Sequence, residues 1–274
     1  MVHVVSANGA QIPAIGFGTW DVRGEACMRM VDGAIRAGYR HVDTAAMYDN
    51  EVQVGKGLRA SGVPRDDVFV TTKVWYDMIG YGDLQRSAEE SLKRLDLDKV
   101  DLLLIHWPNP SIPLKDSIKA LCETKTQGLA QHIGVSNFPS ALVEEACSLS
   151  SEPLAVNQVE YHVGLDQSKV LAAGRGHGMA LTAYSPLGKG DLFSNPVLQR
   201  IGAAHGKTAG QVALQWLIQQ EGVIAIPRSN KVANMKANLV VGDFVLSAAE
   251  MAEVAALGSR EGRMIDPGWA PDWD

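Results

Sequence analysis

The chain has few cysteines and no apolar run long enough to cross a membrane. Its 274 residues include three widely separated cysteines, Cys27, Cys122 and Cys147. An odd number without a Cys-x-x-Cys pair argues against a disulfide framework or a zinc ribbon and is typical of a reducing compartment. No apolar run approaches the roughly 20 residues of a membrane span, and the N-terminus shows no secretion signal. We therefore expect a cytoplasmic protein without membrane contact.

Basic charge is also scarce. The 25 Lys and Arg residues stand against 31 Asp and Glu residues, which gives a formal net charge of −6. Domains that bind nucleic acid usually carry a clustered basic face, so we predict no nucleic-acid partner. Charged residues make up 20% of the chain and hydrophobic residues 46%, a balance that is typical of globular proteins and excludes extensive disorder.

Short apolar runs alternate with longer amphipathic segments along the chain. Asn8-Gly9, between two pairs of β-forming residues, predicts an N-terminal hairpin. Eight later runs have the character of strands: Ala14–Phe17, Arg40–Asp43, Val68–Lys73, Val100–His106, Gln131–Val135, Ala155–Glu160, Ala180–Tyr184 and Val223–Ile226. Helical periodicity marks Glu25–Ala37, Asp83–Leu95, Lys115–Gln127, Pro139–Ser148, Gln167–His177, Pro196–His205, Thr208–Gln220 and Ala248–Leu257.

This alternation predicts the fold. Strands as short and apolar as Val100–His106 are typical of a parallel sheet that is buried on both faces. Eight repeats without a break in composition or a Pro-, Gly- or Ser-rich linker favour one closed barrel over an open doubly wound sheet. We therefore predict an α/β fold, a (β/α)8 TIM barrel with an N-terminal β-hairpin, as a single domain over residues 1–274.

Polar residues occur where the predicted strands end. Asp43, Lys73 and His106 end three of them, and Tyr48 follows five residues after Asp43. Because the carboxyl ends of barrel strands meet at one rim, these side chains are expected to lie together. Each residue alone has a structural explanation, such as a helix cap, an ion pair or a packing ring. Unpaired charge at a barrel rim is costly, so four such residues together favour a functional site.

Seven motifs, in the family's order, resemble those of the aldo-keto reductases. They are Asp43–Glu51, Thr72–Trp75, Ile105–Pro108, Gly134–Phe138, Asn157–Glu160, Tyr184–Leu187 and Ile226–Ser229. The resemblance implies reduction of an aldehyde or ketone by hydride from a nicotinamide cofactor. Within the family, the short loop after His106 and the ending Ala270–Asp274 are similar to the bacterial 2,5-diketo-D-gluconate reductases, some of which reduce methylglyoxal.

The resemblance assigns the four polar residues to one reaction. Hydride attack puts negative charge on the carbonyl oxygen, so a proton donor must stand beside it. The pKa of a free tyrosine is about 10, and a neighbouring ammonium lowers it. We therefore expect Tyr48 to be the general acid and Lys73 the ammonium. Asp43 would hold Lys73 by an ion pair, and His106 would orient the carbonyl.

The cofactor site is implied by the same resemblance. Gly16-Phe17-Gly18 begins like a dinucleotide fingerprint, but Asp21 stands in the place of the third glycine, so a Rossmann site is not predicted. Ser136, Asn137 and Gln158 would hydrogen-bond the carboxamide. Further contacts are implied for Tyr184 under the nicotinamide ring, for Ser185 and Leu187 along the pyrophosphate, and for Thr19, Trp20, Asp43, Ser229, Asn230, Asn234 and Asn238. The segment from Gly188 to Gly190 either folds over the pyrophosphate or is a plain turn.

The adenosine side departs from the family's usual pattern. A 2′-phosphate favours Arg or Lys, and Arg228 stands here for the usual Lys. Asn234 replaces the usual Arg, and Ala237 replaces the usual acidic or amide residue before Asn238. Arg228 and Lys231 keep positive charge. We therefore predict NADPH as the cofactor, with NADH use also open and a weaker preference than in relatives.

Tryptophans follow three of the predicted strands. Trp20, Trp75 and Trp107 are expected to wall a substrate pocket above Tyr48, although Trp75 has an equal claim to packing between loops. The Trp-rich tail either closes the edge of this pocket or docks on the barrel. A small dicarbonyl or keto acid, such as methylglyoxal or 2,5-diketo-D-gluconate, is the expected small-molecule substrate. A broad-specificity aldehyde or aldose reductase is the alternative, and Asn50 and Lys189 are candidate partners for a substrate anion.

Other classes stay open at this point. Asp43 paired with Glu51 or Glu160 would suit a barrel hydrolase or isomerase, although a glycosidase usually carries Glu at two strand ends. A binding module that senses the cofactor is a further class, because some relatives are channel subunits with the same fold. The dispersed histidines have no metal-ligand spacing, and nothing predicts a dimer seam, so we expect a monomer without a metal.

Overall fold

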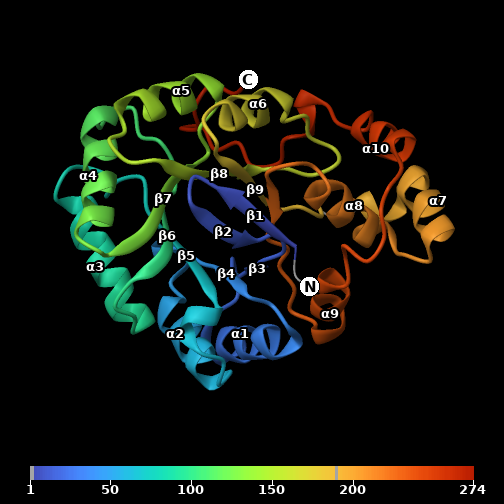
Figure 1. The fold of residues 1–274 in the computed structure, drawn as a ribbon, viewed down its shortest axis with the longest axis horizontal. Coiled ribbons are helices and arrows are strands. Elements are labelled where there is room, and N and C mark those ends of the chain that lie inside the picture. Colours follow the sequence, from blue (N-terminus) through green and yellow to red (C-terminus); the bar gives the residue numbers. More distant parts are fainter. Residues whose placement is uncertain (1–2, 189–190) are drawn as a thin grey trace.

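The computed structural model describes residues 3–188 and 191–274, and these form a parallel barrel surrounded by helices (Figure 1). The barrel strands are β3 (Phe17–Gly18), β4 (His41–Asp43), β5 (Phe69–Val74), β6 (Val100–Ile105), β7 (Ala130–Ser136), β8 (Leu154–Glu160), β9 (Ala180–Tyr184) and β10 (Val223–Ala225). They pair in chain order, each parallel to the next. A parallel bridge between Ile15 and Ala225 joins the two ends of the sheet. The predicted (β/α)8 barrel is confirmed.

The first strand is placed slightly differently from the prediction. The sequence pattern assigns Ala14–Phe17, whereas β3 covers Phe17–Gly18. The residues before β3 bond to β10 at the seam: the Gly16 amide donates to the Ala225 carbonyl at 2.9 Å, and the Ala225 amide donates to the Ala14 carbonyl at 2.8 Å. The first residues of the predicted run therefore close the barrel against β10, and only its last residue, Phe17, pairs with β4.

A hairpin covers the amino-terminal end of the barrel. Strands β1 (Val4–Ala7) and β2 (Ala10–Pro13) pair in antiparallel fashion around Asn8 and Gly9. Both turn residues have positive φ, 44° and 87°, as a type I′ turn requires. The Asn8 amide donates to the Leu154 carbonyl at 2.7 Å, and Leu154 begins β8. The predicted hairpin is confirmed, and it leaves the opposite end of the barrel for chemistry.

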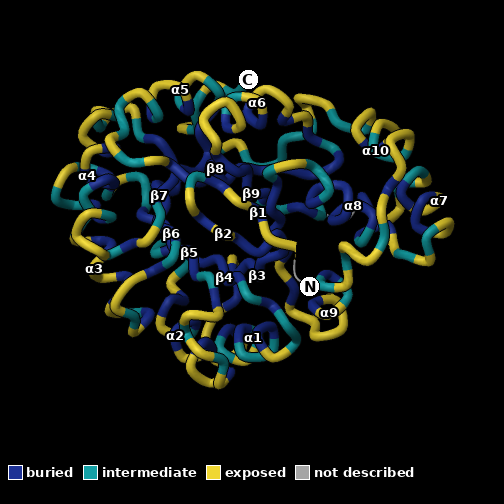
Figure 2. Tube along the Cα trace, in the orientation of Figure 1, coloured by how far each residue is buried: buried dark blue, intermediate teal, exposed yellow. Residues whose placement is uncertain are grey.

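Helices form the outer layer in the order that the periodicity predicts. They are α1 (Gly24–Ala37), α2 (Glu51–Ala60), α3 (Asp83–Leu95), α4 (Leu114–Thr126), α5 (Ser140–Leu149), α6 (Ser168–Gly176), α7 (Pro196–His205), α8 (Ala209–Ile218), α9 (Val232–Leu239) and α10 (Ala248–Ala255). Figure 2 shows buried strands at the centre and exposed outer helix faces. No helix in the described part of the chain has the length and apolarity needed to cross a bilayer.

Helices α2 and α9 are not expected from the sequence pattern. Gly55 and Gly57 lower helix propensity in α2, but they permit close packing on its neighbours. A Cβ on Gly55 would lie 2.1 Å from the Leu95 carbonyl oxygen, and one on Gly57 would lie 2.8 Å from that of Met28. These glycines therefore bring α2 against the end of α3 and the middle of α1.

Candidate active site

A buried lysine is the centre of the polar cluster at the carboxyl end of the barrel. Lys73 extends from β5, and its Nζ donates to Asp43 Oδ1 at 2.5 Å and to the Thr44 carbonyl at 2.9 Å. Its third partner is Tyr48 Oη, at 3.2 Å. Both charged side chains of the pair are almost completely buried. The lysine thus contacts two of the residues that the sequence pattern singles out.

The carboxylate of Asp43 is held from several sides. The Gln158 amide donates to Asp43 Oδ2 at 2.7 Å, and Lys73 occupies the other oxygen. The Thr19 hydroxyl donates to the Asp43 backbone carbonyl at 3.0 Å. Strands β4, β5 and β8 are therefore linked through one carboxylate, because each supplies one member of this network.

Burial and charge act in opposite directions on the tyrosine. Burial raises the pKa of the Tyr48 phenol, and the Lys73 ammonium lowers it, with burial outweighing the ammonium. The expected net lowering of the Tyr48 pKa is therefore wrong for this structure. Burial lowers the pKa of Lys73, but Asp43 and Tyr48 together raise it by more than burial lowers it. The pKa of Lys73 therefore lies above its ordinary value. At neutral pH the phenol is protonated and the amine is charged.

His106 lies on the other side of the tyrosine. The ring centroids of His106 and Tyr48 are 5.6 Å apart, with the planes at 73°. Burial, and then the charge of Lys73, hold the pKa of His106 well below its usual range. The ring is therefore neutral at pH 7. Its buried Nδ1 has no hydrogen-bond partner within the described residues.

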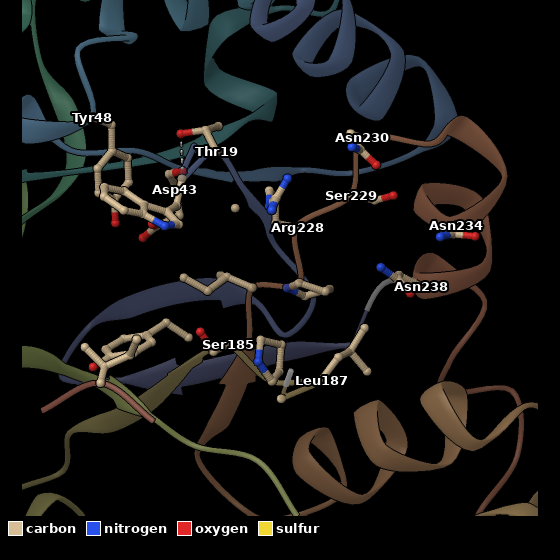
Figure 3. A pocket seen from close by; sticks show the side chains of 18 of the residues that line it. Thr19, Asp43, Tyr48, Ser185, Leu187, Arg228, Ser229, Asn230, Asn234 and Asn238 are labelled. Atoms are coloured by element: carbon tan, nitrogen blue, oxygen red, sulfur yellow. Dashed lines mark hydrogen bonds between the residues drawn. The ribbon is translucent and has the colours of Figure 1, made fainter. Parts of the chain in front are cut away.

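A cavity of about 620 Å³ opens beside this cluster. Figure 3 shows Tyr48 and Asp43 on one side of it, Asn234 and Asn238 on the other, and Arg228 between them. The predicted site residues on its wall are Thr19, Trp20, Asp43, Tyr48, His106, Trp107, Asn137, Tyr184, Ser185, Leu187, Arg228, Ser229, Asn230, Asn234 and Asn238. The structure thus brings most of the predicted cofactor residues to one elongated cavity that ends at Tyr48.

Two of the predicted cofactor residues have strained backbones. Asn137 has φ 62° and Ser185 has φ 49°, a region that residues other than glycine adopt infrequently. Both follow the ends of strands, β7 and β9, and both line the cavity. Strain of this kind gathers at ligand-binding sites, where the surrounding structure holds it in place.

Two predicted carboxamide partners lie just behind the cavity wall. Ser136 and Gln158 are almost completely buried, and the Ser136 hydroxyl donates to the Gln158 carbonyl at 2.7 Å. Asn137 stands in front of them: its amide donates to the His106 carbonyl at 2.9 Å, and its oxygen accepts from the Tyr184 hydroxyl at 2.8 Å. The three predicted residues therefore form one hydrogen-bonded group, of which Asn137 reaches the cavity surface.

Aromatic side chains form the wall near Tyr48. Trp20 is 51% exposed, and its ring lies 4.9 Å from that of Tyr48. Trp107 also lines the cavity. Trp75 is not among the lining residues; its ring packs 5.1 Å from His106 and 6.0 Å from Trp269. The structure therefore places Trp75 behind the wall, between His106 and the tail.

The tail is fastened to the barrel rim by two carboxylates. Glu160, at the end of β8, accepts from the Met264 and Ile265 amides at 2.8 and 2.9 Å. Burial would raise the pKa of Glu160, but hydrogen bonds from His162 and these two amides bring it below the ordinary value. Asp274 accepts from the Ser140 amide at 2.8 Å, at the start of α5. The tail therefore docks on the barrel and also brings Ile265 to the cavity.

Some residues of the wall are not predicted, and some candidates do not reach it. Met47, Phe193 and Ile265 line the cavity; the position of Met47 beside Tyr48 is the one signal that could have indicated any of them. Asn50 is buried, and its amide donates to the Thr19 and Val22 carbonyls at 2.9 and 3.0 Å. It is therefore not free to bind a substrate anion. Lys189 and the expected fold of its segment lie outside the described residues.

The paired-carboxylate alternative finds no support in the geometry. Glu51 is buried, bonded to Thr72 and Arg94 on the outside of the barrel wall, and Glu160 is occupied by the tail. Neither carboxylate lines the cavity with Asp43. Among the described residues, no three His, Cys, Asp or Glu side chains gather as a metal ion requires.

Comparisons with known proteins agree with the resemblance. A sequence model of the Aldo/keto reductase family matches residues 14–259. The chain is 39% identical over 267 residues (96% of this chain, 99% of the relative) to methylglyoxal reductase DkgB of Escherichia coli O157:H7. A crystal structure with the provisional name 2,5-diketo-D-gluconic acid reductase B is 48% identical with a TM-score of 0.98, covering 100% of this chain and 98% of that one. An aldo-keto reductase of Bombyx mori in complex with NADP is 32% identical with a TM-score of 0.90, covering 97% and 95%.

These matches extend along almost the whole chain and include the strands that carry the polar cluster. The expected single domain, monomeric state and cytoplasmic location stay predictions. The family assignment does not depend on them, because it rests on the sequence match and on the shared barrel. The chain belongs to the aldo-keto reductase family and is an NAD(P)H-dependent oxidoreductase that acts on carbonyl groups.

Proposed function

We propose that this enzyme uses NADPH to reduce a small dicarbonyl compound, methylglyoxal in the first place, with Tyr48 as the general acid. One observation carries this proposal. Lys73 Nζ lies 2.5 Å from Asp43 and 3.2 Å from Tyr48 Oη, at the end of a cavity that also contains His106. A phenol, an ammonium and a neutral imidazole at one point are the groups that protonation of a carbonyl oxygen requires.

Tyr48 supplies the proton. Because burial keeps its pKa above the ordinary value, the hydroxyl is fully protonated at neutral pH. Lys73 opposes this effect, so the phenolate that forms on proton transfer is stabilised by an ammonium at 3.2 Å. Asp43 holds the amine in place and keeps it charged.

His106 orients the carbonyl. Its neutral ring has one N–H and one acceptor nitrogen, so it can donate a hydrogen bond to the substrate oxygen without adding a charge. A protonated ring would place a second cation beside Lys73, and this repulsion is one reason why its pKa is low. The proton therefore comes from Tyr48 in preference to His106.

The residues around the cavity fit a nicotinamide cofactor. When bound, the reduced nicotinamide supplies a hydride to the carbonyl carbon. Asn137 and Ser185 combine positive φ angles with a place on the cavity wall, a combination that is frequent at ligand-binding sites. Asn137, with Ser136 and Gln158 behind it, would hold the carboxamide, and Tyr184 would face the ring. Ser185 and Leu187 would border the pyrophosphate.

Arg228 supports NADPH as the preferred coenzyme. Ser229, Asn230, Asn234 and Asn238 line the cavity beyond it, and these neutral side chains offer hydrogen bonds but no charge. A 2′-phosphate would therefore depend on Arg228, whose guanidinium binds phosphate in a bidentate manner. A single cation predicts a modest preference for NADPH over NADH.

The wall near Tyr48 favours a small uncharged substrate. Trp20 and Trp107 give it an apolar surface, and Arg228 is the only Lys or Arg among the described lining residues. Lys73, beside Tyr48, is paired with Asp43 and does not line the cavity, so a carboxylate on the substrate would lack a free cationic partner there. Methylglyoxal therefore fits better than 2,5-diketo-D-gluconate, although relatives carry both names.

Replacement of Tyr48 by Phe tests the general acid. Loss of the phenolic proton should lower kcat/KM for methylglyoxal reduction by about 10²- to 10⁴-fold, while NADPH still quenches tryptophan fluorescence. Y76F is a matched control, because Tyr76 lies outside the cavity lining, stacked on Trp269. A loss smaller than about tenfold in Y48F would show that the assignment is wrong.

The protonation state of His106 gives a prediction about pH. Because burial and Lys73 lower its pKa, the ring should remain neutral at pH about 6.5, where an exposed histidine is half protonated. The folded state then binds fewer protons than the unfolded state, so this group makes the protein less stable as pH falls below that value. Imidazole ¹⁵N shifts of the labelled enzyme measure the midpoint. A midpoint at or above that of free histidine would contradict the prediction.

The coenzyme preference is tested by kcat/KM for NADPH and NADH. NADPH should give the higher value, and R228A should lower it by about 10- to 100-fold with little change for NADH, as expected for loss of one charged hydrogen-bond pair. N234R should increase the preference, because it adds a second cation to the cavity wall. Equal values for the two coenzymes in the unmodified enzyme would refute the assignment.

A substrate panel tests the proposed specificity. The kcat/KM measured from NADPH oxidation should be highest with methylglyoxal and lower with 2,5-diketo-D-gluconate, aromatic aldehydes and aldoses. Equal rates with aldoses and aromatic aldehydes would identify a broad-specificity reductase. Fluorescence quenching by NADPH without reduction of any compound would instead support a cofactor-sensing module.

A further inference from the structure

A second buried carboxylate, that of Glu51, lies on the outer side of β5, the side opposite to the Lys73 side chain. Glu51 is the first residue of α2 and is 1% exposed. Its Oε1 accepts from the Thr72 hydroxyl at 2.5 Å, and its Oε2 accepts from Arg94 Nε at 2.7 Å. A carboxylate buried this deeply is stable only when its oxygens are bonded and its charge is paired. The reaction proposed above makes no use of it.

The Thr72 contact joins the two segments that carry Tyr48 and Lys73. Tyr48 precedes Glu51 by three residues, and Thr72 is the residue before Lys73 on β5. Successive side chains of a strand point to opposite faces, so Lys73 reaches the cluster inside the rim while Thr72 meets α2 outside it. The Thr72–Glu51 hydrogen bond on the outer face of β5 therefore fixes this strand relative to the turn that carries Tyr48.

That turn is held on both sides. Asp49, between Tyr48 and the start of α2, has φ 53°, a left-handed conformation that Asp adopts as a single residue in turns. On its inner side the turn is held by Asn50, which accepts from Thr44 at 2.8 Å and donates to the Thr19 and Val22 carbonyls. Glu51 holds the outer side. The two residues together keep Tyr48 over the rim.

Arg94 completes the support from the neighbouring helix. It extends from α3 with its side chain 36% exposed, and it also donates to Ser91 Oγ at 3.0 Å. Helix α2 packs between α1 and α3 (Figure 1), and the close approach at Gly55 brings its start within reach of Arg94. The charge of Glu51 is thus balanced from outside the barrel and separately from the Lys73–Asp43 pair.

We infer that Glu51 is a positioning residue for the reduction, which acts through Thr72 and Arg94 to hold the Tyr48 hydroxyl against the Lys73 ammonium. The inference rests on the proposed role of Tyr48. Glu51 does not touch the cavity, so its effect is on the geometry of proton transfer and not on ligand binding. A displacement of about 1 Å between reacting groups can lower a rate by about 10²-fold.

The sharpest test compares T72V with T72S. Valine keeps the shape of threonine but removes the hydroxyl, whereas serine keeps it. T72V should lower kcat for methylglyoxal by about 10- to 100-fold, with KM and NADPH affinity unchanged, and T72S should restore most of kcat. Because Lys73 lowers the pKa of Tyr48, a weaker contact should also move the alkaline limb of the kcat pH profile to higher pH in T72V.

Glu51 itself is tested by E51Q, with E90Q as the matched control. The amide in E51Q still offers an oxygen to Thr72 but loses the ion pair with Arg94, so kcat and the pH profile should change as in T72V. Glu90 is exposed and lies 3.8 Å from Arg94 on the same helix, so E90Q should leave both unchanged. Denaturant unfolding of each variant reports whether it folds; the nearly isosteric T72V keeps the test available if E51Q does not.

The outcomes separate this inference from the proposed function. If T72V and E51Q keep the kcat and pH profile of the unmodified enzyme while Y48F is inactive, the positioning role is overturned and the general acid stands. If T72S fails to restore kcat, or if NADPH affinity falls in parallel, the link is merely structural and the inference also fails. If Y48F remains active, the proposed function fails first.

Discussion

The Lys73–Asp43 ion pair is the interaction on which the site depends. Both charges are removed from water, and a buried pair is tolerated only when the remaining donors and acceptors are satisfied. The Thr44 carbonyl and the Gln158 amide meet this need, and they come from the segment after β4 and from β8. The cost of burying one pair therefore constrains strands on opposite sides of the rim, and it places the Lys73 ammonium against the Tyr48 hydroxyl.

Much of the fold follows from local patterns in the sequence. The Asn8-Gly9 turn and the repeated apolar runs predict the hairpin and the barrel, because each depends on residues close in sequence. The meeting of Asp43, Lys73 and His106 is also predictable, since parallel strands of a barrel end at the same rim. Helix α2 could not be predicted in this way. Its two glycines have low helix propensity, and their role, close packing against α1 and α3, depends on contacts that are distant in sequence.

The parts that escape prediction depend on long-range balance. Ile265 reaches the cavity because amides of the tail bond to Glu160, which is more than 100 residues away in sequence. The pKa of Tyr48 is set by competition between burial and Lys73, and a sequence shows the charge but not the depth of burial. The sequence leaves open whether Trp75 lines the pocket or packs between loops, and its contact with Trp269 of the tail, far away in sequence, accompanies its position outside the cavity lining.

The hairpin across the amino-terminal end of the barrel has a kinetic consequence. The Asn8 side-chain amide donates to the Leu154 and His177 carbonyls, so two side-chain to main-chain hydrogen bonds hold the hairpin across that end. Reactant and alcohol then share the opening at the opposite rim. Because the carbonyl substrate and the alcohol product would use the same opening, a bound alcohol would exclude the next substrate molecule from the cavity.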